Sequence, residues 1–210
     1  MDIKKAYIAI DGVIGVGKTT LVNMLTNRFK GKAVYEIVEE NPFLADFYKD
    51  PKRYAFQTQM FFLLSRYRQQ QELPQRELFF QPLVSDYIFA KDKIFAYLTL
   101  EARELFLYEK IVKLMERDIS KPDLVIYLKS SPDRLMKNIK KRDRPFEREM
   151  KFEYIEALNK AYNKFFNFYR ETPQLILNVA KMDFVENKDD LNKIVELILS
   201  DIKGHFILET

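Results

Sequence analysis

A lysine and a threonine close a glycine-rich stretch near the N-terminus, where they could bind phosphate. Residues 12–19 read Gly-Val-Ile-Gly-Val-Gly-Lys-Thr, which fits the Walker A pattern. Glycines let backbone N–H groups turn inward around a phosphate, and the start of a helix adds partial positive charge. We expect Lys18 to reach the β- and γ-phosphates and Thr19 to offer its hydroxyl to Mg²⁺. The residues expected to bind the nucleotide are Gly12, Gly15, Val16, Gly17, Lys18, Thr19 and Thr20.

A second group of basic residues follows a predicted helix late in the chain. Arg142 and Arg144 stand in the sequence Arg-Asp-Arg-Pro, within a polar hinge at residues 142–149. Phosphoryl transfer depends on positioning and on neutralising charge, so arginines that close over the phosphates would serve as a lid. The alternative is a solvated helix face, the usual meaning of a charge run.

The helical pattern at residues 52–71 carries two polar side chains among apolar ones. Gln59 and Arg66 are seven residues apart and therefore share a helix face, with Phe62 and Leu63 between them. A carboxamide and a guanidinium beside an aromatic ring could bind the edge of a nucleobase while the ring stacks on it. The alternative is two exposed polar residues on a helix whose other faces form the core.

Short apolar runs alternate with longer helical patterns. Strands are expected at residues 7–10, 33–38, 82–85, 124–128 and 175–178. Helices are expected at 18–30, 42–48, 52–71 (ended by Pro74), 89–119 with a break near Leu100, 131–141, 151–170 and 189–203. This alternation predicts an α/β fold, a five-stranded parallel sheet with helices on both faces. The whole chain, residues 1–210, is expected to form one domain.

Carboxylates follow the strands that should end beside the phosphate loop. In open parallel sheets, ligands bind beyond the carboxyl ends of the strands. Asp11 follows the first predicted strand, Glu36 lies near the end of the second, and Asp86 follows the third. Glu36 has no basic neighbour in the sequence and could take a proton from an acceptor hydroxyl. A strand-end glutamate that faces solvent is the alternative, and the residues alone leave both open.

Composition excludes several classes of function. The 210-residue chain contains no cysteine, which rules out disulfides and thiolate metal sites. Its one histidine, His205, is expected on the surface or in a tail, so catalysis should depend on carboxylates, lysines and arginines. The net charge of +4 is too small to indicate nucleic-acid binding. No apolar signal segment or membrane span is visible, which favours a cytoplasmic enzyme without a membrane partner.

These segments, in this order and spacing, resemble the deoxynucleoside kinase family, in particular the bacterial deoxyguanosine and deoxyadenosine kinases. The similarity extends from Ile8 to about Asp183. It is carried by residues 10–20, 36–44, 59–66, 85–87, 125–128 and 142–147. The resemblance implies a P-loop nucleoside-kinase fold and ATP-dependent phosphorylation of the 5′-hydroxyl of a deoxyribonucleoside in nucleotide salvage, with Mg²⁺ as cofactor. It also implies a homodimer formed through a pair of helices.

The resemblance assigns a role to each matching position. Glu36 would be the general base, and Tyr48 with Glu147 would hold the 3′-hydroxyl. Gln59 would bind the base, and Arg66 and Asp92 would pair with each other and with the base's opposite edge. Asp86 would help place Mg²⁺ together with Thr19. The residues implied in catalysis are Lys18, Glu36, Arg142 and Arg144.

Two positions depart from the family pattern. The family commonly has an arginine directly after the third-strand acid, whereas this chain has Tyr87 after Asp86. The role of that arginine is therefore unassigned, and the tyrosine favours a purine substrate. Asp143 stands where glycine is frequent, which would stiffen the hinge.

Other functions remain open to the sequence. A nucleoside monophosphate kinase of the thymidylate type shares the loop and lid, but it needs extra basic groups for the acceptor's phosphate. A non-catalytic nucleotide-binding module would not need Lys18, Asp86 and two lid arginines together. Preference among guanine, adenine and cytosine is not determined by these residues.

Overall fold

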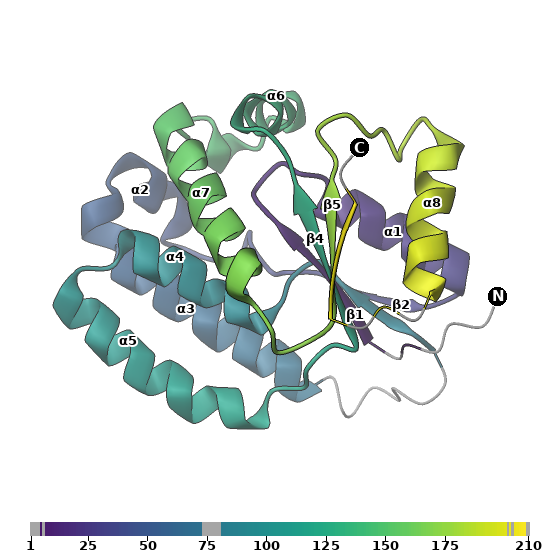
Figure 1. The fold of residues 1–210 in the computed structure, drawn as a ribbon. Coiled ribbons are helices and arrows are strands. Elements are labelled where there is room, and N and C mark those ends of the chain that lie inside the picture. The colour runs from purple at the N-terminus through teal and green to yellow at the C-terminus, as the bar shows by residue number, and fades with distance from the viewer. Residues whose placement is uncertain (1–4, 6, 73–80, 201, 203, 209–210) are drawn as a thin grey trace.

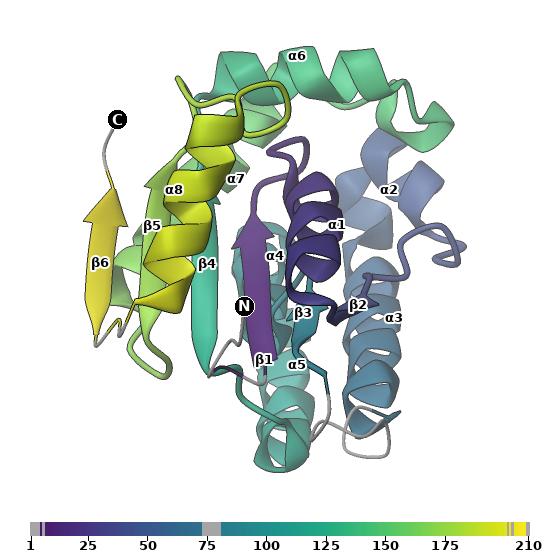
Figure 2. The same cartoon turned by 90° about the vertical axis from the view of Figure 1, so that its right-hand side faces the viewer.

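A twisted parallel sheet forms the centre of the molecule. The computed structural model describes residues 5, 7–72, 81–200, 202 and 204–208. In these residues the sheet has six strands in the order β2-β3-β1-β4-β5-β6, and each neighbouring pair is parallel (Figure 2). The strands are β1 (Tyr7–Gly12), β2 (Lys32–Val34), β3 (Leu83–Ser85), β4 (Leu124–Lys129), β5 (Gln174–Asn178) and β6 (His205–Leu208).

Helices cover both faces of this sheet. In Figures 1 and 2, α1 and α8 lie on one face, α3, α4, α5 and α7 lie on the other, and α6 crosses the end toward which the strands point. The helices are α1 (Lys18–Phe29), α2 (Leu44–Lys49), α3 (Pro51–Glu72), α4 (Asp92–Thr99), α5 (Ala102–Met115), α6 (Pro132–Arg142), α7 (Phe152–Phe168) and α8 (Lys188–Leu199). Short 3₁₀ turns are η1 (Phe89–Lys91), η2 (Glu116–Asp118) and η3 (Pro145–Glu147).

The core explains why β1 and β4 read as continuous apolar runs. Helices on both faces bury both sides of a central parallel strand, so alternation is lost. Every residue of β1 is buried, Asp11 included, as is all of β4 except Lys129. Helix α7 packs on β4 through aromatic rings: Tyr127 of β4 stacks on Phe166 of α7, with ring centroids 4.2 Å apart. Within the described residues, no helix is both long and apolar enough to span a membrane.

The sheet differs from the five-stranded prediction at both edges. The sixth strand, β6, is an edge strand that contains His205, so this histidine does not lie in a tail: its side chain is half-buried, and its Nδ1 lies 2.7 Å from Gln174 Nε2. The last helix ends at Leu199, not near residue 203, which frees the chain to form this edge strand. A four-residue strand after a long helical pattern leaves almost no periodic signal.

The second strand is shorter than predicted. β2 ends at Val34, whereas the apolar pattern predicted a strand to residue 38. Its partner β3 ends at Ser85, and the next side chain, Asp86, accepts a hydrogen bond from the backbone of Glu36 at 2.7 Å. The carboxylate thus replaces the backbone partner that a longer strand would have needed.

Helix boundaries follow the local signals more closely. The expected break near Leu100 separates α4 from α5, where Glu101 and Glu104 form a capping box. Pro42 precedes the short helix α2 instead of lying in it. The structure describes α3 up to Glu72. Pro74, which was expected to end this helix, lies outside the described residues.

Candidate active site

The glycine-rich loop links β1 to α1 and leaves the start of that helix open. Gly15 and Gly17 have φ of 83° and 104°, a region that favours glycine. A Cβ on Gly15 would also come within 2.8 Å of Ile139 Cγ1 and of a backbone oxygen of α6. Gly17 caps α1 without a side chain, so no cap competes for the N–H groups of the first turn. Lys18 Nζ folds back over the loop to Gly12 O at 2.7 Å. The loop therefore has the geometry of an anion site.

Two cavities meet at this loop. One, of about 650 Å³, lies between the loop, α6 and residues 179–186. The other, of about 300 Å³, lies among the end of β2 and helices α2, α3 and α7. Four side chains line both cavities: Lys18, Thr19, Arg142 and Arg144. A group passed from a ligand in one cavity to a ligand in the other would move past three cationic side chains.

Glu36 lies in the smaller cavity between two buried cations. Its Oε1 accepts a hydrogen bond from Arg66 Nε at 2.8 Å, and its Oε2 lies 2.6 Å from Lys91 Nζ. The solvent-facing alternative is thus excluded, since the side chain is only 12% exposed. Burial alone would raise the pKa of Glu36, but Lys91 and Arg66 together hold that pKa well below its usual range. Glu36 is therefore a carboxylate throughout the neutral range.

Lys91 is the site residue that sequence reasoning missed. It is nearly fully buried and lines the smaller cavity, although no motif marks it. Glu36 has no basic neighbour in the sequence, but it has two in the folded protein, Lys91 from η1 and Arg66 from α3. A lysine five residues after Asp86, in a turn that follows the strand end, is the only sequence signal that could have indicated it.

Asp86 connects the loop to the smaller cavity. Thr19 Oγ1 donates a hydrogen bond to Asp86 Oδ2 at 2.9 Å, while Asp86 Oδ1 accepts the backbone N–H of Glu36. A hydroxyl and a carboxylate beside a phosphate site are oxygen ligands of the kind that Mg²⁺ uses with nucleotide phosphates. In the described part of the chain, His, Cys, Asp and Glu side chains form no group of three or more suited to a metal ion. These two residues therefore fit a magnesium ion that a bound nucleotide also coordinates.

Asp11 has a structural position beneath the loop. Its carboxylate is fully buried and accepts the backbone N–H groups of Gly12, at 2.6 Å, and Ile88, at 3.1 Å. Burial raises the pKa of Asp11, against the opposing charges of Lys91 and Lys18. The residue joins the end of β1 to the segment after β3 and so fixes Asp86 relative to the loop.

One side of the smaller cavity is built by α3. Gln59 is 2% exposed, so the alternative of a solvent-facing glutamine is wrong. Its Oε1 atom is buried and has no hydrogen-bond partner among the described residues, which indicates a ligand that donates to it. The guanidinium of Arg66 lies over the ring of Phe62, 4.8 Å from its centroid. Gln59, Phe62 and Arg66 thus offer an acceptor, an aromatic face and a donor to a planar ligand.

Asp92 lies behind Arg66 and does not line the cavity. It forms an ion pair with Arg66 Nη1, and its Oδ2 accepts a hydrogen bond from Tyr108 of α5 at 3.0 Å. The pairing of Arg66 with Asp92 agrees with the role that the resemblance implies. In this structure the carboxylate of Asp92 is 1% exposed and is enclosed by these two partners, so that it holds the guanidinium in place. Its contact with a base stays a prediction.

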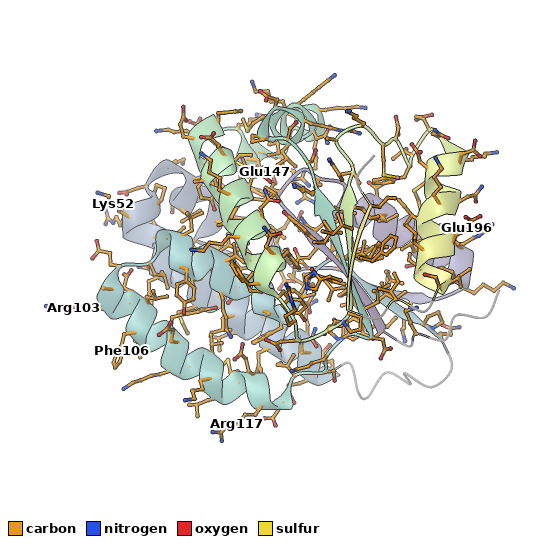
Figure 3. The ribbon with its side chains drawn as sticks, viewed as in Figure 1. Lys52, Arg103, Phe106, Arg117, Glu147 and Glu196 are labelled. Carbon is orange, nitrogen blue, oxygen red and sulfur yellow. The ribbon has the colours of Figure 1, made fainter. Side chains whose placement is uncertain are left out.

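The other wall of the cavity carries Tyr48 and the hinge residues. Glu147, labelled near α6 and α7 in Figure 3, is buried and pairs with Arg142, with Nη2 2.5 Å from Oε1. Arg144 pairs with Glu39 at 3.2 Å. Burial raises the pKa of Tyr48 well above its usual value, so its hydroxyl stays protonated. Asp143 caps α6 in the left-handed conformation (φ 49°), the conformation that glycine would adopt most easily.

A glycine-rich phosphate loop at the carboxyl edge of a parallel sheet, joined to a second ligand cavity, defines a phosphotransferase of the P-loop class. The family model "Deoxynucleoside kinase" matches residues 8–203, and the chain belongs to this family. It is 42% identical to a deoxyguanosine kinase of Bacillus subtilis over 90% of this chain and 93% of that one. A deoxyadenosine kinase of Lactobacillus acidophilus is 32% identical over 91% and 94%.

Solved structures agree with this assignment. The deoxyadenosine kinase of M. mycoides with bound dATP superimposes with a TM-score of 0.80 at 28% identity, covering 92% of this chain and 99% of that one. The match supports the α/β fold with its parallel sheet. The chain is therefore a deoxynucleoside kinase in family and a phosphotransferase in reaction class.

The position of Lys18 makes nucleotide binding dependent on pH. Burial, with the nearby charge of Lys91, lowers the pKa of Lys18 to about 8. A bound phosphate favours the ammonium form and so raises this pKa. Below pH 8 the lysine is already charged and no proton is needed; above pH 8, binding must take one up. We expect ATP binding to take up close to one proton at pH 9 and much less at pH 7.5.

Isothermal titration calorimetry in buffers of different ionisation enthalpy measures this uptake. Substituting Lys141→Met, on the exposed surface of α6 at the same cavity, should leave the difference between the two pH values intact. An equal proton count at pH 7.5 and pH 9 would contradict the expectation.

Proposed function

We propose that the protein transfers the γ-phosphoryl group of ATP to the 5′-hydroxyl of a purine deoxyribonucleoside, deoxyguanosine or deoxyadenosine. The observation that carries the proposal is the meeting of the two cavities at Lys18, Thr19, Arg142 and Arg144. The larger cavity, built on the phosphate loop, would take ATP, and the smaller would take the nucleoside. A cytoplasmic role in nucleotide salvage is part of the same proposal.

The chain's own residues provide orientation and charge. Phosphoryl transfer passes through a loose transition state in most analyses, so positioning and electrostatic stabilisation dominate over covalent chemistry. Lys18, Arg142 and Arg144 lie where the transferring group carries negative charge. Glu36 would accept the hydrogen bond of the 5′-hydroxyl and then its proton, because that carboxylate is ionised and faces the cavity. A magnesium ion at Thr19 and Asp86 would neutralise phosphate charge.

The sugar end of the nucleoside would lie against the hinge. Glu147 accepts hydrogen bonds and Tyr48 can donate one, which suits a neutral 3′-hydroxyl. In the structure Glu147 and Glu39 hold the lid arginines Arg142 and Arg144. We propose that residues 142–149 close over the phosphates as a lid, with the arginines exchanging these carboxylates for phosphate oxygens.

The purine preference is supported by the relatives' names and by the shape of the base site. Gln59 offers an unpartnered oxygen and Arg66 offers donors, a pair that suits a purine edge carrying both donor and acceptor groups. A thymidylate-type kinase would need a cationic site for a phosphate already on the acceptor. Here Arg66 and Lys91 are paired with Glu36, and Arg142 is paired with Glu147, so these cations of the smaller cavity already have carboxylate partners.

A product assay tests the proposal. Purified protein with ATP and Mg²⁺ should convert deoxyguanosine or deoxyadenosine to the 5′-monophosphate faster than deoxycytidine or thymidine, as measured by chromatography of the nucleotides. Lys18→Ala should abolish product, because the loop then lacks its cation. Phosphate added to dTMP alone would exclude the proposed reaction.

Replacing Glu36 tests its role as base. Glu36→Gln should lower kcat by roughly 10²–10⁴-fold, the usual contribution of a general base, with nucleoside binding largely retained. Steady-state kinetics and nucleoside titration measure the two effects. Glu40→Gln, an exposed glutamate of the same loop, is the matched control and should be as active as the wild type. Near-wild-type turnover in Glu36→Gln would remove this residue from the mechanism.

We further propose a homodimer formed through α4 and α7. An open groove of about 760 Å³ runs between these helices and is mainly apolar, lined among others by Tyr97, Leu98, Phe165 and Phe168. Phe168 is 76% exposed and Tyr97 is 60% exposed, and both lie in this one apolar groove, where a partner would remove their surface from water.

Charge placed in this groove should separate the dimer. We expect the wild type to sediment as a dimer in analytical ultracentrifugation and Phe168→Glu as a monomer, because a buried unpaired carboxylate disfavours association. Phe106→Glu is the control: Phe106 is 60% exposed on the outer side of α5, away from the groove (Figure 3). A monomeric wild type, or dissociation by Phe106→Glu alone, would contradict this interface.

A further inference from the structure

Lys91 is a lysine in an environment where lysine is rarely found. It ends η1, directly before α4, and is 2% exposed. Its Nζ lies 2.6 Å from Glu36 Oε2 and 5.9 Å from the centroid of the Tyr87 ring. Burying an ammonium group is costly unless a charged partner compensates it, and an ion pair of this kind is weak support for stability. Its position inside the ligand cavity instead suggests a part in the reaction.

The carboxylate of Glu36 depends on side chains for its orientation. Glu36 lies beyond the last residue of β2, and its backbone is held by one hydrogen bond to Asp86. Arg66 holds Oε1 and Lys91 holds Oε2. The two cations therefore determine which way the carboxylate faces.

The two cations are not equivalent. Arg66 is also paired with Asp92 and packed on Phe62, so its guanidinium is committed to the wall of the cavity. Lys91 also acts on groups of the phosphate loop: its positive charge helps to lower the pKa of Lys18 and opposes the rise in the pKa of Asp11. A bare carboxylate beside the phosphates of a bound nucleotide would repel them. An ammonium group on Oε2 offsets that repulsion at the side where the phosphates would lie.

The resemblance to the deoxynucleoside kinases places Tyr87 where that family commonly has an arginine. Its ring is fully buried, and Gln70 Nε2 lies 3.5 Å from its hydroxyl beneath the cavity. Tyr87 therefore presents no cation to Glu36. Four residues further along, Lys91 does.

We infer that Lys91 is the positioning residue for Glu36, which it orients toward the 5′-hydroxyl and shields from the phosphates. This inference rests on the proposed function, because the acceptor hydroxyl is that of the nucleoside. Lys91 acts through Glu36 and not by binding the base, so its loss should lower kcat and leave the nucleoside KM nearly unchanged.

The first test is a set of single substitutions. Lys91→Met, of similar length without charge, should lower kcat roughly 10²-fold with less than a threefold change in KM, since a general base contributes 10²–10⁴-fold and part of this depends on its orientation. Lys91→Arg restores the charge and should recover at least about a tenth of wild-type kcat. Lys160→Met removes an exposed lysine paired with Glu156 on α7 and is the matched control, expected to match the wild type.

A double-mutant cycle separates positioning from an independent or merely structural role. If Lys91 acts through Glu36, then Glu36→Gln/Lys91→Met should have the same kcat as Glu36→Gln, because the group that Lys91 orients is already absent. A further loss of more than about tenfold in the double variant would overturn the inference. So would wild-type kcat in Lys91→Met, or a loss confined to KM.

The remaining outcomes are also decisive. Circular dichroism and thermal unfolding show whether each variant folds. If the single variant Lys91→Met does not fold, the comparison of the double variant with Glu36→Gln and the activity of Lys91→Arg still test the inference. A wild-type protein without turnover of any deoxynucleoside overturns the proposed function and this inference with it. An active wild type with an unaffected Lys91→Met overturns this inference alone.

Discussion

The structure of the site depends on one carboxylate held between two buried cations. Glu36 follows β2, Arg66 comes from α3 and Lys91 from the turn before α4, so their contacts tie three separate segments together at the sheet edge. Each of these charges would be costly to bury alone, and each is compensated by the others and by Asp92. The same arrangement keeps Glu36 ionised and aimed into the cavity. The same ion pairs therefore determine both how the three segments meet and the charge state of Glu36.

A second constraint is the shared boundary of the two cavities. Lys18 and Thr19 belong to the loop that follows β1, whereas Arg142 and Arg144 belong to the hinge after α6, and both sets border both cavities. In the structure the hinge arginines pair with Glu147 and Glu39, and Lys18 bonds to backbone oxygens of its own loop. In this structure all three cations thus have partners that the oxygens of a bound phosphate group would have to replace.

Prediction from the sequence succeeded where the signal was local. The loop at residues 12–19, the long helix α3, the break at Leu100 and the strand β4 each have a motif, a cap or an apolar run within a few residues. Prediction failed where an element depends on a residue or strand far away in the sequence. The four-residue strand β6 forms because it pairs with the edge of β5. β2 stops at Val34 because the side chain of Asp86 accepts the backbone hydrogen bond of Glu36. The spacing of Asp92 from Arg66 likewise could not reveal that Tyr108 and Arg66 enclose its carboxylate.

The sequence by itself determined the family, the phosphate loop and the alternation that produces a parallel sheet, because these reside in contiguous residues and their spacing. The tertiary structure alone decided how the charges pair. Glu36 has no basic neighbour along the chain, yet Arg66, 30 residues away, and Lys91, 55 residues away, lie against its two oxygens. Electrostatic interactions act through space, so the folded arrangement of three segments was needed to show that the glutamate is a buried, ionised and oriented carboxylate.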